Sequence, residues 1–186
     1  MEPILLDFPN EYISENLYLR SYESGDGKEY YELLQSNKTH LEEEVGEIKE
    51  LTSIEKSERF CRNKKIEWLM RKRLVSIILK KDTNEMIGQI WIEPISWQNR
   101  IFEIGYFISK KFEGQGLVTE AVHASIEFLK ENVKATRIEI RSKAGNIRSW
   151  AVAERCGFTK EGQLRERAVT NDGIKDDLVI YGLLLK

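Results

Sequence analysis

The sequence predicts a mixed α/β fold in one domain that spans residues 1–186. Three consecutive segments with strand character, 74–80, 85–95 and 101–108, are separated by the short polar breaks "KDTN" and "SWQNR", which is typical of a meander. From residue 117 onward the pattern changes to a helix, a strand, a second helix and a closing hairpin. With one strand and the helices that precede the meander, we expect about seven strands flanked by about four helices.

The first strand and the first helix come from residues 15–37. In "ENLYLRSYE", Leu17 and Leu19 lie on one side and Tyr18 and Arg20 on the other, and this alternation indicates a strand. The stretch "SGDGKEYYELLQSN" turns at its glycines and then carries apolar residues at helical spacing, which indicates a helix.

Residues 38–73 are rich in Glu, Lys and Arg and have no strand period, so they predict one or two amphipathic helices. Ser53, with Lys56 three positions later, is a plausible helix N-terminus. The stretch "RNKKIEWLMRKR" could contact RNA or a ribosome, but its interleaved apolar residues favour an ordinary charged helix face. The side expected to be buried carries Ile54, Phe60, Cys61, Trp68 and Leu69.

The second half alternates helices and strands. Apolar and small residues at helical spacing predict a helix of about four turns over 118–129, and "TRIEIR" predicts a strand. "NIRSWAVAERCGF" predicts a short helix that Asn146 could cap and Gly157 could end. "FTKEGQLRERAV" and "IKDDLVIYGLLL" form the closing hairpin, with turn chemistry at Asn171, Asp172 and Gly173.

The composition excludes several classes of protein. Hydrophobic residues make up 41% and charged residues 32% of the chain, which is ordinary for a globular domain. The net charge is −2, with acids and bases interleaved, so there is no overall footprint for nucleic acid. Cys61 and Cys156 fit neither a C-x-x-C motif nor a zinc spacing, which favours reduced thiols.

The N-terminal stretch bears on location. "MEPILLDFPNEYI" lacks the basic patch and apolar run of a signal peptide, and no apolar run reaches the roughly 18 residues of a membrane helix. We therefore expect a cytoplasmic protein with no membrane partner and no nucleic-acid partner.

Two glycines, Gly114 and Gly116, stand one residue apart just before the helix candidate. The first N–H groups of a helix have no internal partners, and the helix dipole favours negative charge there. Glycine lets a ligand approach the backbone more closely than a Cβ would allow. The pair therefore predicts a seat for an anion, most naturally a phosphate. A tight strand-to-helix turn with nothing bound is the alternative that this stretch leaves open.

Other phosphate-binding loops fit less well. A Walker P-loop has a longer spacing between its glycines and then Lys-Ser/Thr, and this loop has neither. A dinucleotide fingerprint requires a further glycine where Thr119 stands, and an acid at the end of the next strand, whereas Glu139 lies in mid-strand. The loop fits a pyrophosphate held by main chain alone, without a metal or a dedicated lysine.

Two ordered motifs carry a family resemblance. "EIGYFISKKFEGQGLVTEAV", followed about thirty residues later by "NIRSWAVAERCGF", resembles the GNAT family of acetyl-CoA-dependent N-acetyltransferases, and within it the RimJ/RimL branch of ribosomal-protein N-terminal acetyltransferases. The family's loop Q/R-x-x-G-x-G/A falls on residues 111–116, where Lys111 departs from the usual Gln or Arg. The resemblance runs from about Asn16 to the C-terminus and is weakest over 38–73. It implies the GNAT fold, with a mixed, mostly antiparallel central sheet.

The resemblance implies acetyl-CoA as the cosubstrate and no metal. The loop would hold the pyrophosphate mainly by main-chain amides, so the departure at Lys111 is expected to matter little. By family analogy the third strand of the meander would accept the pantetheine arm as if it were another strand, through backbone groups of Gly105, Phe107 and Ile108, and one N–H would face the acetyl oxygen. The implied cofactor-binding residues are Tyr106, Phe107, Ile108, Lys111, Glu113, Gly114, Gln115, Gly116, Leu117, Val118, Thr119, Asn146 and Ser149.

Direct acetyl transfer to an amine needs a neutral amine. An N-terminal amine has a pKa of roughly 7.7–8.0, so modest help from a base suffices, whereas a lysine amine near 10.4 needs more. Glu103 is the best candidate for the base, because its side chain lies on the same strand face as the Gly105 position. A solvated acid at the strand end is the equally weighted alternative. Asp176 and Asp177 are weaker rivals that could instead bind substrate.

The helix at 146–158 carries the expected partner of the leaving thiolate. Ser149 matches a serine of the RimL branch, and its weakly acidic hydroxyl suits a hydrogen bond to the thiolate; a local backbone bond is the alternative. Asn146 could cap its own helix or hold the pantetheine amide. Tyr181 is a candidate acid, although a tyrosine in a sheet is more often part of the core.

The acceptor stays open at this point. The expectation is an amine acceptor, either a protein N-terminus, with a ribosomal protein suggested by the resemblance, or a small molecule such as a polyamine, an amino acid or an aminoglycoside. A non-catalytic CoA-binding module is the rival from another class. The oligomeric state is also open, with a homodimer as one option. Trp91, Trp97 and Trp150 could border an acceptor groove, although aromatic packing is the default.

Overall fold

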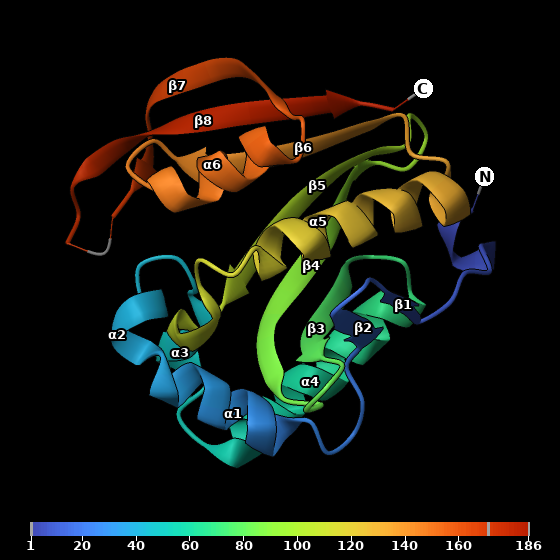
Figure 1. Cartoon of the computed structure of the whole chain (residues 1–186), viewed down its shortest axis with the longest axis vertical. Coiled ribbons are helices and arrows are strands. Elements are labelled where there is room, and N and C mark those ends of the chain that lie inside the picture. Colours follow the sequence, from blue (N-terminus) through green and yellow to red (C-terminus); the bar gives the residue numbers. More distant parts are fainter. Residues whose placement is uncertain (1, 171, 186) are drawn as a thin grey trace.

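An eight-stranded mixed sheet runs through the computed structural model, which describes residues 2–170 and 172–185 (Figure 1). The strand order is β1-β2-β3-β4-β5-β6-β8-β7, and every neighbouring pair is antiparallel except β5 and β6. The strands are β1 (Glu11–Ile13), β2 (Leu17–Ser21), β3 (Leu74–Lys80), β4 (Met86–Ser96), β5 (Ile101–Ile108), β6 (Arg137–Lys143), β7 (Thr159–Val169) and β8 (Lys175–Leu184).

Six α-helices pack around this sheet in the described part of the chain. They are α1 (Gly27–Ser36), α2 (Lys38–Leu41), α3 (Glu47–Glu50), α4 (Ile54–Leu69), α5 (Leu117–Phe128) and α6 (Ile147–Arg155). Two 3₁₀ turns, η1 (Pro3–Leu5) and η2 (Lys110–Phe112), and a π-helical turn, η3 (Leu129–Val133), complete the elements. The mixed, mostly antiparallel α/β fold is therefore confirmed.

The expected counts of seven strands and four helices are each too low. The additional strand, β1, has only three residues and pairs with β2. Residues 38–73 form three helices rather than one or two, because α2 and α3 are single turns of four residues each. Elements this short carry too few residues to display a period, so their existence depends on what they pack against.

The two faces of the sheet build two separate cores. Helices α1 to α4 cover the face that carries Val75, Ile77 and Phe107, although Trp68 near the end of α4 packs into the opposite core. Helices α5 and α6 cover the opposite face, where Ile90 and Ile104 are buried. Figure 1 shows α1–α4 grouped beside β3 and β4, α6 beside β6 and β8, and α5 running between these two groups.

Helix α4 confirms its predicted start but not its whole predicted buried side. Ser53 caps the helix by accepting a hydrogen bond from the Lys56 amide (3.2 Å). Cys61 and Trp68, seven residues apart on one stripe, are fully buried, as predicted. Ile54 and Leu69 are exposed, so their prediction was wrong: they are the first and last residues of the helix.

The C-terminal elements follow the prediction. The Asn146 side chain accepts a hydrogen bond from the Ser149 amide (3.2 Å) at the start of α6, and Gly157 ends that helix with a φ of 83°. Gly173 has a φ of 82° in the hairpin turn, while Asn171 lies outside the described residues. Within the described chain, no helix has both the length and the apolar character needed to cross a membrane.

Candidate functional site

Six consecutive backbone amides are free at the start of α5. Gly114 and Gly116 adopt φ values of 72° and 78°, which an L-residue reaches only with strain, and Gly116 is the N-cap. The first bond of the helix joins the Glu120 amide to the Gly116 carbonyl (3.0 Å). The amides of residues 114–119 donate no hydrogen bond to any residue that the structure describes. Free N–H groups at a helix N-terminus suit an anion.

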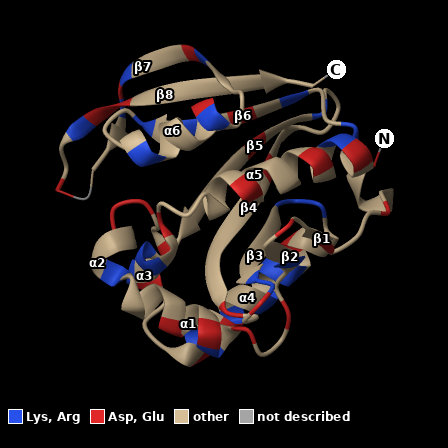
Figure 2. Ribbon diagram, in the orientation of Figure 1, with Lys and Arg blue, Asp and Glu red and all other residues tan. Residues whose placement is uncertain are grey.

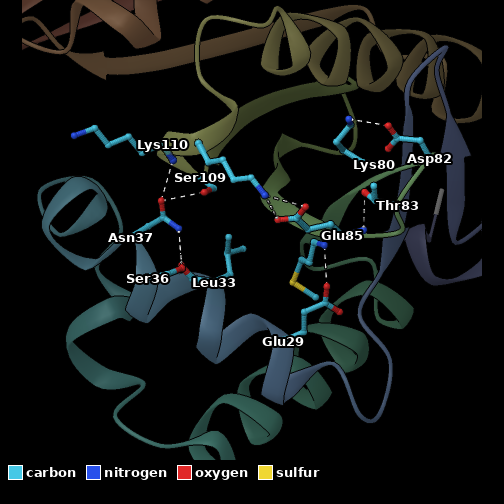
Figure 3. A network of polar contacts seen from close by, with 12 residues as sticks. Glu29, Leu33, Ser36, Asn37, Lys80, Asp82, Thr83, Glu85, Ser109 and Lys110 are labelled. Carbon is cyan, nitrogen blue, oxygen red and sulfur yellow. Dashed lines mark hydrogen bonds and ion pairs between the residues drawn. The ribbon is translucent and has the colours of Figure 1, made fainter.

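The loop before these amides is anchored to α1 by Asn37 (Figure 3). The buried Asn37 side-chain oxygen accepts hydrogen bonds from the Ser109 hydroxyl (3.1 Å) and the Lys110 amide (2.8 Å). Its side-chain nitrogen donates to the Leu33 carbonyl (2.9 Å). Asn37 was not predicted as a site residue, because its partners are more than seventy residues away along the chain.

Charged side chains of the same loop make further contacts. Glu113 lies between two basic side chains: the His40 Nε2 atom and the Arg148 Nη1 atom are each 3.0 Å from its Oε1 atom. The Lys111 ammonium pairs with Glu85 at the end of the preceding hairpin (3.1 Å). The loop is thereby fastened to α2, α6 and the β3–β4 turn at once.

The edge of β5 that faces β6 is open. Strand β6 pairs with β5 only at residues 101–103, and beyond Glu103 the two parallel strands separate. Since the Ser109 amide bonds to the Ile87 carbonyl on β4 (2.7 Å), alternate residues of β5 bond to β4. The residues between them direct their N–H and C=O groups to the open edge.

The residues of β5 that were expected to bind ligand differ in the direction of their main-chain groups. Tyr106 and Ile108 direct their main-chain groups to the open edge, together with Ile104. Gly105 and Phe107, whose backbone groups were also expected to serve, instead direct these groups toward β4. The Phe107 side chain is buried against the α1–α4 core.

Glu103 stands where the two strands part, on the face covered by α1–α4. Its neighbour on that face is Gly105, and the Trp91 indole fills the space above this glycine: a Cβ at Gly105 would come within 2.2 Å of the indole ring. Trp91 therefore packs beside the expected base, while the indole nitrogens of Trp97 and Trp150 bond to backbone carbonyls.

The pKa values of two neighbouring carboxyls at this point are shifted in opposite directions. Burial raises the pKa of Glu103, and Arg141 opposes this without reversing it. Burial would also raise the pKa of Glu139, its register partner on β6, but hydrogen bonds from Arg137 and Arg141 outweigh that effect and lower it. Pairs of carboxyls whose pKa values are shifted apart in this way are typical of sites that transfer protons.

Ser149 and Asn146 lie at the N-terminal end of α6. The Asn146 side-chain oxygen caps the helix, and its side-chain nitrogen is the group available to donate to a ligand. The Tyr106 hydroxyl donates to the Ser149 carbonyl (2.8 Å), which ties β5 to α6 across the parted strands. Burial raises the pKa of Tyr106, which keeps its hydroxyl protonated as the donor of this bond.

The remaining predicted catalytic candidates lie further along β8. The buried Tyr181 hydroxyl donates to the Glu154 carboxylate (3.1 Å), and burial together with this contact raises the pKa of Tyr181. Asp177 accepts hydrogen bonds from the β7 residues Gln163 (2.6 Å) and Glu166 (2.8 Å). Asp176 accepts one from the Gly145 amide (3.2 Å).

A cleft of about 1040 Å³ separates the α1–α2 side from the α6 and β7–β8 side. Its charged lining is balanced, with four carboxylates against four lysine and arginine side chains and one histidine. Charges are likewise interspersed through both halves of the fold (Figure 2). These lining residues are Glu43, Glu44, Asp172, Asp176, Lys38, Lys110, Lys143, Arg148 and His40.

The free amides, the open strand edge and the carboxyl with a raised pKa define a class of protein. Together they suit a group-transfer enzyme that lays a phosphate-bearing carrier along a strand and presents its tip to a base. Residues 16–159 match the family model described as the acetyltransferase (GNAT) domain, and the chain belongs to this family. The GNAT family that the sequence motifs indicated is thereby confirmed, and the similarity to a ribosomal-protein-serine acetyltransferase favours the RimJ/RimL-like branch.

Several known proteins are similar to the chain. The ribosomal-protein-serine acetyltransferase of Escherichia coli (strain K12) is 28% identical over 93% of this chain and 95% of that protein. YdaF of Bacillus subtilis (strain 168) is 40% identical, but the match covers only 53% of this chain and 54% of YdaF, about half of each. The crystal structure of the microcin C7 self-immunity acetyltransferase MccE, in complex with acetyl-CoA and AMP, superposes with a TM-score of 0.84 at 27% identity, over 92% of this chain and 93% of MccE.

Proposed function

We propose that the chain transfers the acetyl group of acetyl-CoA to the N-terminal amine of a protein, by direct attack and without a metal. The free amides of residues 114–119 carry this proposal, because they suit a diphosphate and lie at the end of the strand that leads to Glu103. The complex of MccE with acetyl-CoA supports the choice of carrier. When bound, acetyl-CoA would supply an activated acyl group.

The binding residues act largely through their backbone. The amides of Gly114 to Thr119 would hold the diphosphate, and the side chains of Lys111, Glu113 and Gln115 would shape the loop. Lys111 and Glu113 already have partners outside the loop, and the Gln115 side chain donates to the Lys111 carbonyl (3.1 Å). A loop fixed in this way holds its amides in place before the ligand arrives, which lowers the entropy cost of binding.

The open edge of β5 would receive the extended arm. Free N–H and C=O groups of Tyr106 and Ile108 suit an amide-containing chain that lies parallel to the strand. An N–H on this edge would also face the acyl oxygen, where negative charge develops as the amine attacks. The Asn146 side-chain nitrogen would bind the arm from the opposite side.

Glu103 would accept the proton of the attacking amine. An amine with a pKa of roughly 7.7–8.0 is partly neutral at pH 7, so a carboxylate can complete its deprotonation. The raised pKa of Glu103 makes it a stronger base than an ordinary glutamate. Ser149 would donate a hydrogen bond to the departing sulfur. Tyr181 is the weaker candidate for this role, because its hydroxyl is already bonded to Glu154.

The acceptor is proposed from the charge of the cleft, whose lining includes Asn146, Ile147 and Arg148 at the start of α6, beside Ser149. A polyamine or an aminoglycoside requires an excess of carboxylates, whereas this cleft has equal numbers of acidic and basic side chains apart from His40. A single N-terminal amine with uncharged neighbours requires no such excess. The relative that acts on ribosomal-protein serine supports a ribosomal protein as the acceptor. A cytoplasmic location fits this acceptor and stays a prediction.

The test follows thiol release from acetyl-CoA with different acceptors. Peptides with free N-termini, beginning with Ser or Ala, should be acetylated, and mass spectrometry should place the acetyl group on the α-amine. The same peptides blocked at the N-terminus but containing lysine are the matched controls and should be inactive. Faster turnover of spermidine or an aminoglycoside would contradict the proposed acceptor, and no acceptor-dependent release at all would contradict the transferase.

A further inference from the structure

A row of five side chains with alternating charge crosses three strands and ends at Glu103. It starts at Glu161 on β7, continues through Arg137, Glu139 and Arg141 on β6, and reaches Glu103 on β5. All three β6 members lie on the face of that strand opposite the buried Ile138 and Ile140. We refer to these five residues as the charged row.

The contact at the Glu103 end of the row is its longest. Arg137 Nε is 2.9 Å from Glu139, and Arg141 Nη2 is 2.8 Å from the other oxygen of Glu139. Arg141 Nε is 3.5 Å from Glu103, beyond an ordinary hydrogen bond. Glu139 therefore holds Arg141 firmly, and Arg141 acts on Glu103 through its charge.

The other end of the row is built into the fold. Arg137 forms a two-point ion pair with Glu161, with Nη1 2.9 Å from Oε1 and Nη2 close to the second oxygen. A Cβ at Gly182 on β8 would come within 2.4 Å of Glu161 and 2.7 Å of Arg137. The missing side chain at Gly182 leaves room for this pair, so the row is supported on three strands.

We propose that Arg141 is a positioning residue for the proton acceptor Glu103, held in place by Glu139 and the rest of the charged row. This inference rests on the proposed function of Glu103 as the base. The charged groups that act on Glu103 are Glu93 and Arg73 from the β3–β4 side and Glu139 and Arg141 from β6. Without Arg141, two carboxylates would face Glu103 with only the more distant Arg73 to balance them.

The role of Arg141 is to keep Glu103 ionised while leaving it free to accept a proton. An arginine in full contact would bind the carboxylate bidentately and weaken it as a base. An arginine bound to Glu139 instead keeps its charge beside Glu103 without occupying both oxygens. The open site at the parted strands is then available to the amine.

The test measures the ionisation of Glu103 directly. In protein labelled with ¹³C at the glutamate carboxyl, the Glu103 resonance is assigned by its loss in Glu103→Gln. Arg141→Gln should raise the midpoint of its titration by about one pH unit, because a cation within about 4–6 Å lowers a carboxyl pKa by 1–3 units and this pair is partly exposed. Arg141→Lys keeps the charge and should restore most of the shift.

Arg62→Gln is the matched control. Arg62 pairs with Glu58 on the outside of α4 (2.7 Å), so this variant makes the same change in net charge away from the site. Its Glu103 midpoint should equal that of the wild type. The ratio of variant to wild-type kcat/KM, followed against pH, cancels the ionisation of the acceptor amine and should fall on the acid side only in Arg141→Gln.

The outcomes separate this inference from the function on which it rests. Suppose that the wild type is active. An unchanged Glu103 midpoint in Arg141→Gln, or an equal shift in Arg62→Gln, would then show that Arg141 does not position the base. A wild type without turnover towards any amine would overturn the proposed function, and with it the catalytic role of both residues, whatever the titration gives.

Discussion

The two ends of the candidate site are built in different ways. At the start of α5, the molecule offers main-chain amides whose geometry depends on two glycines with positive φ. At the parting of β5 and β6, it offers side chains, Glu103 and its charged neighbours, whose properties depend on burial and on one another. The binding proposed at the first end depends on backbone geometry and tolerates most side-chain changes, whereas the proton transfer proposed at the second end depends on individual side-chain groups.

The largest effect is expected from Gly116→Val. A β-branched residue is strained at a φ of 78°, and the amides that follow would turn away from the ligand. CoA affinity should fall by at least about 100-fold, since several charge-assisted hydrogen bonds of roughly 1.5–3 kcal/mol each are affected. Isothermal titration with CoA measures the change.

Gly25→Val is the control for backbone strain alone. Gly25 has a φ of 107° in the loop before α1, away from the free amides. Its variant should lose stability but keep CoA affinity. Equal losses of affinity in both variants would mean that the loop does not hold the ligand.

A smaller effect is expected at the other end, from Glu103→Gln. The amide has nearly the same shape but cannot take a proton, so kcat/KM for an N-terminal peptide should fall by about 100-fold, the low end for general-base catalysis. CoA affinity should stay at the wild-type value, which is the reverse of the Gly116→Val result. A kcat/KM within twofold of the wild type would remove Glu103 from the mechanism.

Ser149→Ala should have a still smaller effect. A neutral hydrogen bond to the leaving sulfur is worth about 1 kcal/mol, so kcat should fall by about five- to tenfold. The Tyr106 contact is made to the Ser149 carbonyl and survives the substitution, so α6 should stay in place. Single-turnover kinetics measure the acyl-transfer step. A normal rate here, with a slow rate in Tyr181→Phe, would transfer the role to Tyr181.

The smallest expected effect is that of Glu103→Gln on the stability of the fold. Because burial raises the pKa of Glu103, the folded state holds its proton more tightly than the unfolded state. The ionised side chain therefore lowers stability above the folded pKa, and Glu103→Gln should be more stable than the wild type at pH 7. The difference should vanish below about pH 4, where the carboxyl is protonated in both states. Thermal unfolding at the two pH values tests this; lower stability of Glu103→Gln at pH 7 would contradict the sign.

Several features of this site could be predicted from local pattern. The glycine pair, the Ser53 cap and the Asn146 cap each depend on residues within a few positions of one another, and all three have the predicted conformation. The short polar breaks between "LVSIILK" and the two strand segments that follow it likewise predicted the meander. Only the short elements β1, α2 and α3 lacked enough residues to show a period.

The partners that support the site could not be predicted in this way. Asn37 reaches Ser109 across 72 positions, and His40 and Arg148 meet at Glu113 from two different helices. Their sequence contexts are those of ordinary polar surface residues. A contact of this kind leaves no periodic signal, because the two partners are brought together only when the sheet has formed.

Local sequence pattern was sufficient to predict the order of the main elements, the turn with its two positive-φ glycines and the family. These depend on backbone conformation and on residues that are close along the chain. The folded structure is needed to show which β5 residues face the open edge, where β5 and β6 part, and which charges surround Glu103. The physical reason is that register and burial are properties of packed strands, so the ionisation of a carboxyl is set by neighbours that the linear chain does not bring together.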